Sequence, residues 1–407
     1  MHFILENTKS PLKKYSIYIV AFVIVALSSY ILNDALASLN IDEQLSTKIT
    51  EEHTKKQPFL IEWFSKKETK KVSQKLDALL KRINKNHDFH GSLLVAKKGK
   101  ILYSNQVGYK DFRKKEFLNE KSAFQLASVS KQFTAAAIMI LHERNQIKLT
   151  DTVNRYFPDF PYEDVTIKNL LNHTGGLPKY FWVAEHKWKQ KKAPTNSEMM
   201  DLLESSKVQR FYKPGRNFDY SNTGYLVLAS IVEKVSGLSF SAFVKQHIFD
   251  PLEMDDSYVY SFENDTISTN QLDGFRIYRK WRHLKINKTI NDAIVGDKNV
   301  YSTAEDLFKW TMGLNNGKLF SKESLALMYT KGETVHGKKI PYGFGFRINT
   351  DKENKIYHHG KWNGFRTGLT QYLEDDLVVI VLEHTSYEGI AALNKRIKNI
   401  VVKNFNI

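Results

Sequence analysis

The sequence predicts an α+β domain whose two ends meet in one antiparallel sheet, flanked by helices, with a mainly helical region inserted between the ends. Patterns typical of β-hairpins lie near both ends of the folded part, at residues 91–109 and 367–384, and helical patterns dominate between them. The chain shows neither a regular alternation of strands and helices nor a repeat. Its 407 residues, 42% of them hydrophobic, are enough for a large core.

The first forty residues predict a membrane or export segment. Lys9, Lys13 and Lys14 precede the uncharged stretch YSIYIVAFVIVALSSYIL, residues 15–32. A membrane-spanning helix needs ~20 apolar residues, whereas the core of a signal peptide usually has ~7–15. The length favours an uncleaved anchor, and the small residues Ala35 and Ala37, spaced as in a cleavage site, leave a cleaved signal as the alternative. In both cases the lysines stay inside and the rest of the chain lies outside the cytoplasm.

The next residues predict a spacer. Residues 41–75 are polar and charged, as in DEQLSTKITEEHTKKQ at residues 42–57. We therefore divide the chain into an anchor or signal segment (1–40), a polar spacer (41–75) and one folded domain (76–407).

Two hairpins and a helix frame the predicted domain. In GSLLVAKKGKILYSNQVGY (91–109), we expect a strand at 92–96, a turn at Lys98-Gly99 and a second strand. In TGLTQYLEDDLVVIVLEH (367–384), the turn falls at residues 374–376. A final amphipathic helix follows, with its apolar positions at Ala391, Leu393, Ile397, Ile400 and Val401.

The stretch LASVSKQFTAAAIM (126–139) places polar residues at the entrance to an apolar helix. Residues three apart share a helix face, so Lys131 can reach the hydroxyl of Ser128. Burial lowers the pKa of a lysine, and a neutral amine beside a serine can take its proton. The alternative is a helix cap at Ser128 and a lysine whose charge reaches solvent. The same pattern at Ser10 and Lys13 receives no function.

Two further segments combine polar residues with apolar elements. FDYSNTGYLVLASIVEKVSG (218–237) places Tyr220, Ser221 and Asn222 on a turn before another apolar helix. YHHGKWNGFRTG (357–368) leads into the last hairpin, and its glycines predict a close approach of the backbone to another group.

In this order, the three segments resemble the serine penicillin-recognising family, which includes class C β-lactamases, D-alanyl-D-alanine carboxypeptidases, D-aminopeptidases and related esterases. The marks of that family are S-x-x-K, then Y-x-N, then K-T-G or H-x-G on an edge strand. Four more segments resemble the family: residues 147–161, 167–178, 247–257 and 296–310. The resemblance covers about residues 78–404 and implies a β-lactamase-like fold.

The resemblance also implies roles for the first two motifs. Ser128 is expected to be the nucleophile that forms an acyl-enzyme. Lys131 and Tyr220 are expected to share the proton transfers, and either can be the base for acylation. Asn222 is expected to bind the substrate amide and to help hold Lys131.

In the third motif, His358 stands where relatives usually have lysine, and Gly360 completes His-x-Gly. The resemblance implies an oxyanion hole formed by the backbone N–H groups of Ser128 and Lys361. A fixed cation at the His358 position would bind a substrate carboxylate, so we expect weak activity on β-lactams. With an ordinary pKa of ~6.5, His358 would gain a proton on acidification. Lys361 and Arg366 are alternative sources of the cation.

The composition bears on partners. There are 60 Lys and Arg against 44 Asp and Glu, a net charge of +16. Cations and aromatic residues alternate in HKWKQKK (186–192) and YRKWRHLKINK (278–288), a pattern that can bind nucleic acid. An exported protein rarely meets nucleic acid, so we expect no such partner. The alternatives are an anionic cell-wall polymer or lipid surface, and solvated lysine-rich faces.

The motifs of other classes of enzyme and metal site are absent from the sequence. Cysteine is absent, which excludes disulfides, thiolate metal ligands and a cysteine nucleophile. The sequence has no G-x-S-x-G, no H-E-x-x-H and no glycine-rich phosphate loop. The pair His358-His359 offers too few ligands for zinc. We expect neither metal nor cofactor.

The sequence therefore predicts a serine hydrolase acting on small acyl substrates, such as D-amino-acid or peptidoglycan-type peptides or esters. The alternative is a non-catalytic cell-envelope protein on the same fold that binds wall polymer or senses penicillin. We expect a single-pass membrane protein with its domain outside the cytoplasm, or a secreted or periplasmic protein if the N-terminal segment is cleaved.

Overall fold

The computed structural model describes residues 59–262, 268–279, 282–351 and 353–405, which belong to one compact unit, Phe59–Ile407. The expected anchor or signal at residues 15–32 lies outside the described residues. Within the described ranges, no single helix has the length and apolar character to cross a bilayer. Asn222–Ser236 and Phe240–Leu252 meet that criterion only together, as a pair bent by 81°.

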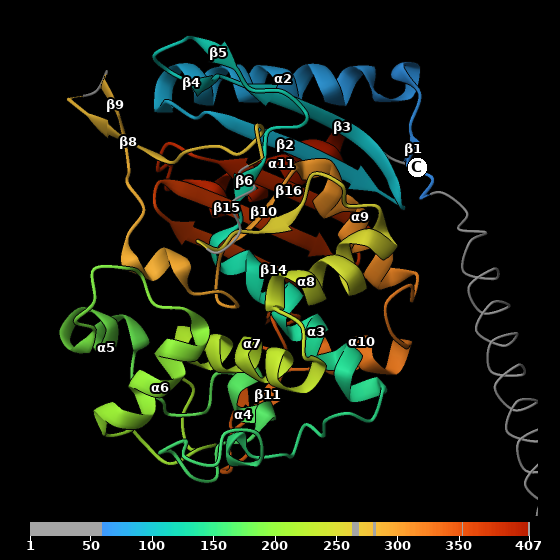
Figure 1. The fold of residues 1–407 in the computed structure, drawn as a ribbon. Coiled ribbons are helices and arrows are strands. Elements are labelled where there is room, and N and C mark those ends of the chain that lie inside the picture. The colour runs from blue at the N-terminus through green and yellow to red at the C-terminus, as the bar shows by residue number, and fades with distance from the viewer. Residues whose placement is uncertain (1–58, 263–267, 280–281, 352, 406–407) are drawn as a thin grey trace, which may run out of the picture. The chain divides into compact units, whose positions relative to one another are not determined.

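A seven-stranded sheet lies at the centre of the unit (Figure 1). Its strands are, in spatial order, β1 (Glu62–Trp63), β3 (Lys100–Val107), β2 (Gly91–Lys97), β16 (Leu377–Glu383), β15 (Phe365–Tyr372), β14 (Lys355–Trp362) and β13 (Arg347–Asn349). Neighbouring strands are antiparallel except β1 and β3, which are parallel. The α+β class predicted from the sequence is confirmed.

The two ends of the domain meet in this sheet, as predicted. Strand β2 pairs with β16 along its whole length, with Leu93 opposite Val381 and Val95 opposite Val379. Both hairpins are present: β2 and β3 are joined by a turn at residues 98–99, and β15 and β16 by a turn at residues 373–376. The sheet therefore ties the first hairpin to the last one.

Both faces of the central strands are buried. On one face, Leu93, Val95, Val379 and Val381 pack against two helices, α2 (Lys66–His87) and α11 (Ile390–Asn404). On the other face, Leu94, Ala96, Ile380 and Leu382 join a larger core with the inserted helices. Burial on both faces explains why these strands are apolar almost throughout, without a polar alternation.

The fold begins earlier than the sequence indicated, because the proposed boundary at residue 76 falls inside α2. The lysine-rich start of this helix, KKETKK, conceals its amphipathic pattern. Its buried side chains follow helical spacing: Thr69, Val72, Leu76, Leu79, Leu80 and Ile83. The structure thus corrects the expected spacer for residues 59–75, and residues 41–58 lie outside the described residues.

The inserted region is mainly helical, as predicted, and lies on the sheet face opposite α2 and α11 (Figure 1). Its α-helices are α3 (Lys131–Glu143), α4 (Ile167–Leu171), α5 (Tyr180–Lys187), α6 (Asn196–Ser206), α7 (Asn222–Ser236), α8 (Phe240–Val244), α9 (Ala304–Asn315) and α10 (Lys322–Met328). Helix α3 is buried on all sides, with Phe133, Ala136, Ile138 and Leu141 in the large core.

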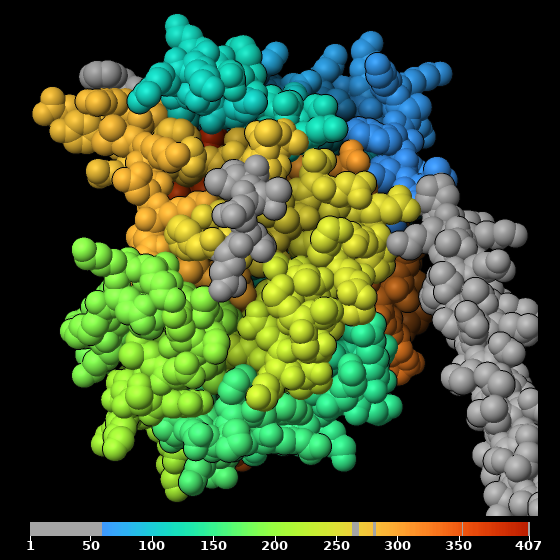
Figure 2. Space-filling view, viewed as in Figure 1, coloured from blue at the N-terminus to red at the C-terminus, as the bar shows by residue number. Residues whose placement is uncertain are grey.

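Short strands complete the fold. They are β4 (Tyr109–Asp111) with β5 (Glu116–Phe117), β6 (Phe124–Gln125) with β10 (Val300–Ser302) and β7 (Tyr258–Val259), β8 (Phe275–Tyr278) with β9 (Arg282–Lys285), and β11 (Gly332–Glu333) with β12 (Lys339–Ile340). Figure 2 shows the β8–β9 hairpin (orange) next to the segment of β4 and β5 (teal). Phe112 and His283 stack between these two segments, with ring centroids 3.6 Å apart.

Candidate active site

Ser128 lies in a tight 3-10 turn, η1 (Ala127–Ser130), that runs directly into α3. Ala127 has a φ of 50°, in the left-handed region that costs a non-glycine residue about 1–2 kcal/mol. The hydroxyl of Thr367 on β15 donates to the carbonyl of Leu126 at 2.7 Å and holds the turn against the sheet. Such strain persists only where neighbouring structure fixes it, and it is typical of functional turns.

Lys131 is completely buried, with 0% of its surface exposed. Its Nζ donates to Ser128 Oγ at 3.2 Å, to Asn222 Oδ1 at 2.8 Å and to the backbone carbonyl of Asp297 at 2.7 Å. Burial lowers the pKa of Lys131 to about 8, with Asp297 raising it and Arg347 lowering it further. The predicted approach of Lys131 to Ser128 is confirmed, and the amine lies within reach of the hydroxyl proton.

The second motif lies at the start of α7. Ser221 caps this helix, its Oγ accepting from the Gly224 N–H at 3.2 Å, and Asn222 is the first helical residue. The Ser221 N–H in turn donates to Nδ1 of His173 at 3.1 Å, and the His173 ring lies 4.3 Å from that of Tyr220. His173 therefore braces the turn that carries Tyr220.

Tyr220 is half-buried at the edge of the site. Burial raises its pKa above the ordinary range, while a hydrogen bond with Ser128 and the charge of Arg347 act in the opposite direction. Its ring also faces the Lys131 ammonium at 5.0 Å. Tyr220 is therefore a neutral phenol in contact with the same serine hydroxyl as Lys131.

The third motif lies on β14. Strand β13 pairs with β14 only as far as Tyr357, so beyond that residue β14 has no outer neighbour among the described strands. A Cβ at Gly360 would lie 2.2 Å from the Leu126 carbonyl oxygen. Glycine is thus required for β14 to reach the turn that carries Ser128, and the close backbone approach predicted from the sequence is present.

His358 differs from our expectation for a titrating residue. It is 1% exposed, its Nδ1 donates to the His359 carbonyl at 2.8 Å, and its Nε2 accepts from the Tyr342 hydroxyl at 3.0 Å. Burial holds its pKa well below the ordinary value, and the nearby charges of Lys131 and Arg347 lower it further. His358 is therefore a neutral imidazole, not a cation that forms on mild acidification.

The side chains of Lys361 and Arg366, the two alternative cations named from the sequence, both pair with a surface carboxylate. Lys361 is 67% exposed at its side chain, and its Nζ contacts Glu388 at 2.9 Å. Arg366 contacts the same carboxylate at 2.7 Å. Both side chains thus form a surface ion pair instead of a substrate-facing charge.

Arg347 supplies the cation that sequence reasoning missed. Its guanidinium carbon lies 5.2 Å from the Tyr220 ring, and its charge lowers the pKa of both Lys131 and His358. In the described part of the chain, no carboxylate forms an ion pair with it. Arg347 belongs to a three-residue strand without a motif, so only the pairing of β13 with β14 reveals its position.

Comparison with known proteins places this geometry in a family. The beta-lactamase family model matches residues 76–402. Penicillin-binding protein 4* from Bacillus subtilis is 34% identical over 331 residues, which cover 77% of this chain and 73% of the relative. The chain belongs to the beta-lactamase family. It is accordingly a serine hydrolase, as the sequence predicted.

Solved structures of similar fold agree with membership of the beta-lactamase family. A penicillin-binding protein from Bacillus halodurans is 25% identical with a TM-score of 0.68, covering 78% of this chain and 98% of its own. FmtA from Staphylococcus aureus is 24% identical with a TM-score of 0.70, covering 88% and 96%. D-amino acid amidase from Ochrobactrum anthropi is 20% identical with a TM-score of 0.67, covering 82% and 98%. The last two likenesses concern the fold alone.

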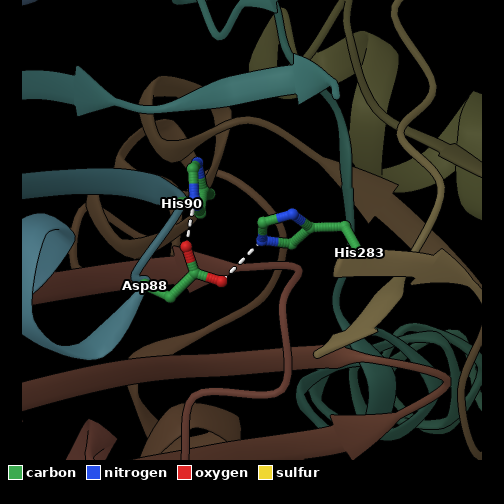
Figure 3. A group of neighbouring side chains, drawn as sticks. All are labelled: Asp88, His90 and His283. Carbon is green, nitrogen blue, oxygen red and sulfur yellow. Dashed lines mark hydrogen bonds and ion pairs between the residues drawn. The ribbon is translucent and has the colours of Figure 1, made fainter. Parts of the chain in front are cut away.

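A separate cluster has the composition of a metal site, away from the residues typical of the beta-lactamase family. Asp88, His90 and His283 place their ligand atoms within 4.8 Å of one another (Figure 3). However, Nδ1 of His90 accepts from the Tyr109 N–H at 2.9 Å, so its Nε2 carries the proton that is donated to Asp88. A metal needs an unprotonated ring nitrogen that is free to bind it; the lone pair of His90 Nδ1 is used by the Tyr109 N–H, and the Nε2 that faces Asp88 is protonated.

Proposed function

We propose that the protein hydrolyses small acyl substrates through an acyl-enzyme on Ser128. The observation that carries this proposal is the hydrogen bond from a buried Lys131, with a pKa of about 8, to the Ser128 hydroxyl at 3.2 Å. A lysine that is partly neutral near neutral pH can accept the serine proton. The strained turn and the buried motifs around it hold the hydroxyl in one place.

Acylation then follows from the positions of these groups. Ser128 Oγ attacks the substrate carbonyl as its proton passes to Lys131, and the new C–O bond produces a tetrahedral oxyanion. Tyr220, a neutral phenol, donates a proton to the leaving group as the bond to that group breaks, and takes one back from Lys131. Water then hydrolyses the acyl-enzyme by the same proton path. The N–H groups of Ser128 and Lys361 are the proposed donors to the oxyanion.

The surroundings of Lys131 and Tyr220 favour lysine as the base. Burial disfavours the charged form of each residue, so it produces a neutral amine and a neutral phenol. A neutral amine accepts a proton, whereas a neutral phenol is far better at donating one. We therefore assign the base in acylation to Lys131, Tyr220 as the acid, and Asn222 as the group that holds the amine and the substrate amide.

The proposed substrates are D-amino-acid or peptidoglycan-type peptides, or esters, with β-lactams as weak substrates. Arg347 supports a peptide with a free carboxylate, because its guanidinium lies beside Tyr220 without an acidic partner in the described part of the chain. A relative is named as a penicillin-binding protein and a fold neighbour as a D-amino acid amidase, which agrees with this class. Neutral His358 contributes no charge and instead fixes the Tyr342 hydroxyl beside Tyr220.

The rival proposal is a non-catalytic envelope protein on the same fold. It would bind cell-wall polymer through its basic segments or sense penicillin by slow acylation. The pKa of Lys131 favours the enzyme, because a binding protein has no need of a buried, partly neutral lysine on a serine hydroxyl. Sustained turnover separates the two proposals.

A fluorophosphonate probe followed by peptide mapping tests the nucleophile. We expect label on Ser128 and loss of both label and turnover in Ser128→Ala. Ser130→Ala is the matched control, because Ser130 is buried and its Oγ accepts from the Val300 N–H at 3.1 Å. Labelling of Ser128 without turnover on any peptide, amide or ester of a panel would favour the sensing protein, and undiminished labelling in Ser128→Ala would contradict both.

We also propose that the protein is exported and held at the membrane by residues 15–32, with an anionic cell-wall polymer as a further partner. The uncharged stretch behind three lysines supports the anchor, and the net charge of +16 supports the polymer. Protease added to intact spheroplasts should digest the domain. Digestion only after lysis would reverse the topology.

A further inference from the structure

A second charged group is buried directly behind Lys131. Asp297 is 1% exposed at its side chain, and the neighbouring Lys298 is 3% exposed. Lys298 Nζ donates to Asp297 Oδ1 at 3.2 Å and to the Tyr180 hydroxyl at 2.5 Å. The Tyr180 hydroxyl in turn donates to Asp297 Oδ2 at 3.1 Å. The three side chains satisfy one another in a closed network.

This network is bonded to the base of the reaction through its main chain. The Asp297 carbonyl accepts from Lys131 Nζ at 2.7 Å, the shortest of the three hydrogen bonds that Lys131 makes. Tyr180 begins α5, and its own N–H donates to Thr223 Oγ1 on α7 at 2.9 Å. The network thus connects the segment before β10 to the helix that carries Asn222.

A buried ion pair gives little net stability, because desolvation of the two charges offsets their attraction. The placement of this pair against the carbonyl that receives Lys131 therefore indicates a role in the reaction. We propose that Lys298 and Tyr180 are positioning residues that hold the Asp297 carbonyl on the Lys131 amine and balance the Asp297 charge beside it. This inference rests on the proposed function of Lys131 as the base.

The charges around Lys131 determine whether its pKa rises or falls when a residue of the network is replaced. The groups that face it or act on it are Asp297 and Lys298 before β10, Arg347 on β13, His358 on β14, His173 after α4, Tyr220 before α7, and Tyr225 and Asn222 on α7. The tyrosines and histidines among them are neutral, because burial disfavours their charged forms. Asp297, Lys298 and Arg347 therefore determine the field at the amine.

The test is the pH profile of kcat/KM for a neutral p-nitrophenyl ester in charge variants. In Lys298→Met the Asp297 carboxylate loses its counter-ion, which should raise the pKa of Lys131. The acidic limb of the profile, where kcat/KM rises as Lys131 loses its proton, should therefore move to higher pH by about one unit or more. In Asp297→Asn the limb should move to lower pH, because a negative charge near Lys131 is removed while the carbonyl remains. The double variant Asp297→Asn with Lys298→Met removes both charges and should return the limb close to the wild-type position.

Tyr180→Phe separates position from charge. It removes the hydroxyl without changing a charge, so we expect a lower kcat/KM at every pH with an unmoved limb. A limb that stays at the wild-type pH in both Lys298→Met and Asp297→Asn would overturn the inference. If Lys298→Met does not fold, the direction of the shift in Asp297→Asn decides alone. Labelling of Ser128 in each variant keeps this result distinct from failure of the proposed function, in which even the wild-type serine would not react.

Discussion

Burial acts in the same sense on Lys131 and Tyr220, because in both residues it disfavours the charged form. For the lysine it produces a base, and for the tyrosine it preserves an acid. One physical cause would therefore supply the two complementary groups that the proposed acyl transfer requires. The opposing effects of Asp297 and Arg347 then adjust the lysine, since the first raises its pKa and the second lowers it.

The first residue-scale prediction concerns the pH dependence of the reaction. The neutral fraction of Lys131 grows as pH rises through its pKa, so kcat/KM for a neutral ester should rise with pH and level off above about 8. Lys131→Met should lower kcat/KM by a factor of about 10²–10⁴ without unfolding the domain. Lys234→Met, an exposed change on α7, is the control. A flat profile from about pH 6 to 9 would leave Lys131 without a role as base.

The second residue-scale prediction concerns recognition of a carboxylate by Arg347. A hydrogen bond to a charged group contributes about 1.5–3 kcal/mol, or roughly ten- to a hundredfold in binding. Arg347→Gln should lower kcat/KM by that factor for a D-alanyl-D-alanine peptide, relative to the same peptide with an amidated C-terminus. Arg366→Gln is the control, because Arg366 is already bound to Glu388. An equal loss on both peptides would assign Arg347 to the shape of the site.

His358 adds an internal check to the same measurement. Because its pKa lies well below the ordinary value, its charge does not change across mild acidification. In the wild-type protein, the ratio of kcat/KM for the peptide with a free carboxylate to kcat/KM for the amidated peptide should therefore stay constant between about pH 5.5 and 8.5. A preference for the carboxylate that grows on acidification would restore His358 as a titrating substrate contact.

At the scale of elements, the sequence predicted what local patterns determine. The two hairpins follow from short apolar runs around turn residues, and α11 from its apolar spacing. The start of α2 was missed because lysines dominate its first turns. Contacts that depend on strand register, or on residues far apart in the chain, were also not predicted from the sequence. Asp297 lies 166 residues from Lys131, and Arg347 reaches the site through the pairing of β13 with β14.

The cluster of Asp88 with two histidines connects the end of α2 to the start of β2 and to the β8–β9 hairpin. Asp88 ends α2, and its carboxylate binds His90 before β2 at 2.9 Å and His283 on β9 at 2.5 Å (Figure 3). Burial would raise the pKa of Asp88, but the hydrogen bonds of His283 and His90 outweigh it and hold the pKa well below its usual range. The carboxylate therefore stays charged to a pH below its ordinary pKa, and it joins the β8–β9 hairpin to the sheet.

We predict that Asp88→Asn loosens the β8–β9 hairpin without changing the backbone at residue 88. Asp88 has a φ of 52°, a conformation that asparagine also tolerates, so the substitution removes the charge selectively. Hydrogen exchange should accelerate at residues 275–279 and 282–285, and Glu116→Gln on neighbouring β5 is the control. The contribution of Asp88 is present above its ordinary pKa of 3.8 and is lost as pH falls through the lower folded value. Unchanged exchange in Asp88→Asn would show that aromatic stacking alone holds the hairpin.

At the scale of the whole molecule, the candidate site depends on the pairing of strands from the two ends of the domain in one sheet. Ser128 follows the first hairpin, while β14 and β15 precede the last strand and hold the Ser128 turn through Gly360 and Thr367. Strand β16 joins these halves by pairing with β2 on one side and β15 on the other. The candidate site therefore requires the last part of the domain to be folded, although Ser128, the proposed nucleophile, lies in the first third of the chain.

The final prediction tests that dependence through Ile397, which is 0% exposed on α11 and belongs to the core shared with α2 and the sheet. Ile397→Ala should lower the free energy of unfolding by about 2–5 kcal/mol, because it removes buried methyl groups and leaves a cavity. Trp310 on α9 is buried in the other core. In a background with the other five of the six tryptophans replaced by Phe, urea unfolding followed by tryptophan fluorescence reports on that core, and far-UV circular dichroism reports on the whole domain. If the ends form one cooperative unit, both signals should shift together to lower urea, and kcat/KM should be unchanged below the transition. Asn399→Ala, an exposed change on the same helix, should leave both curves in place. A shift of the circular dichroism signal alone would mean that α2 and α11 unfold separately from the half of the domain that contains Ser128.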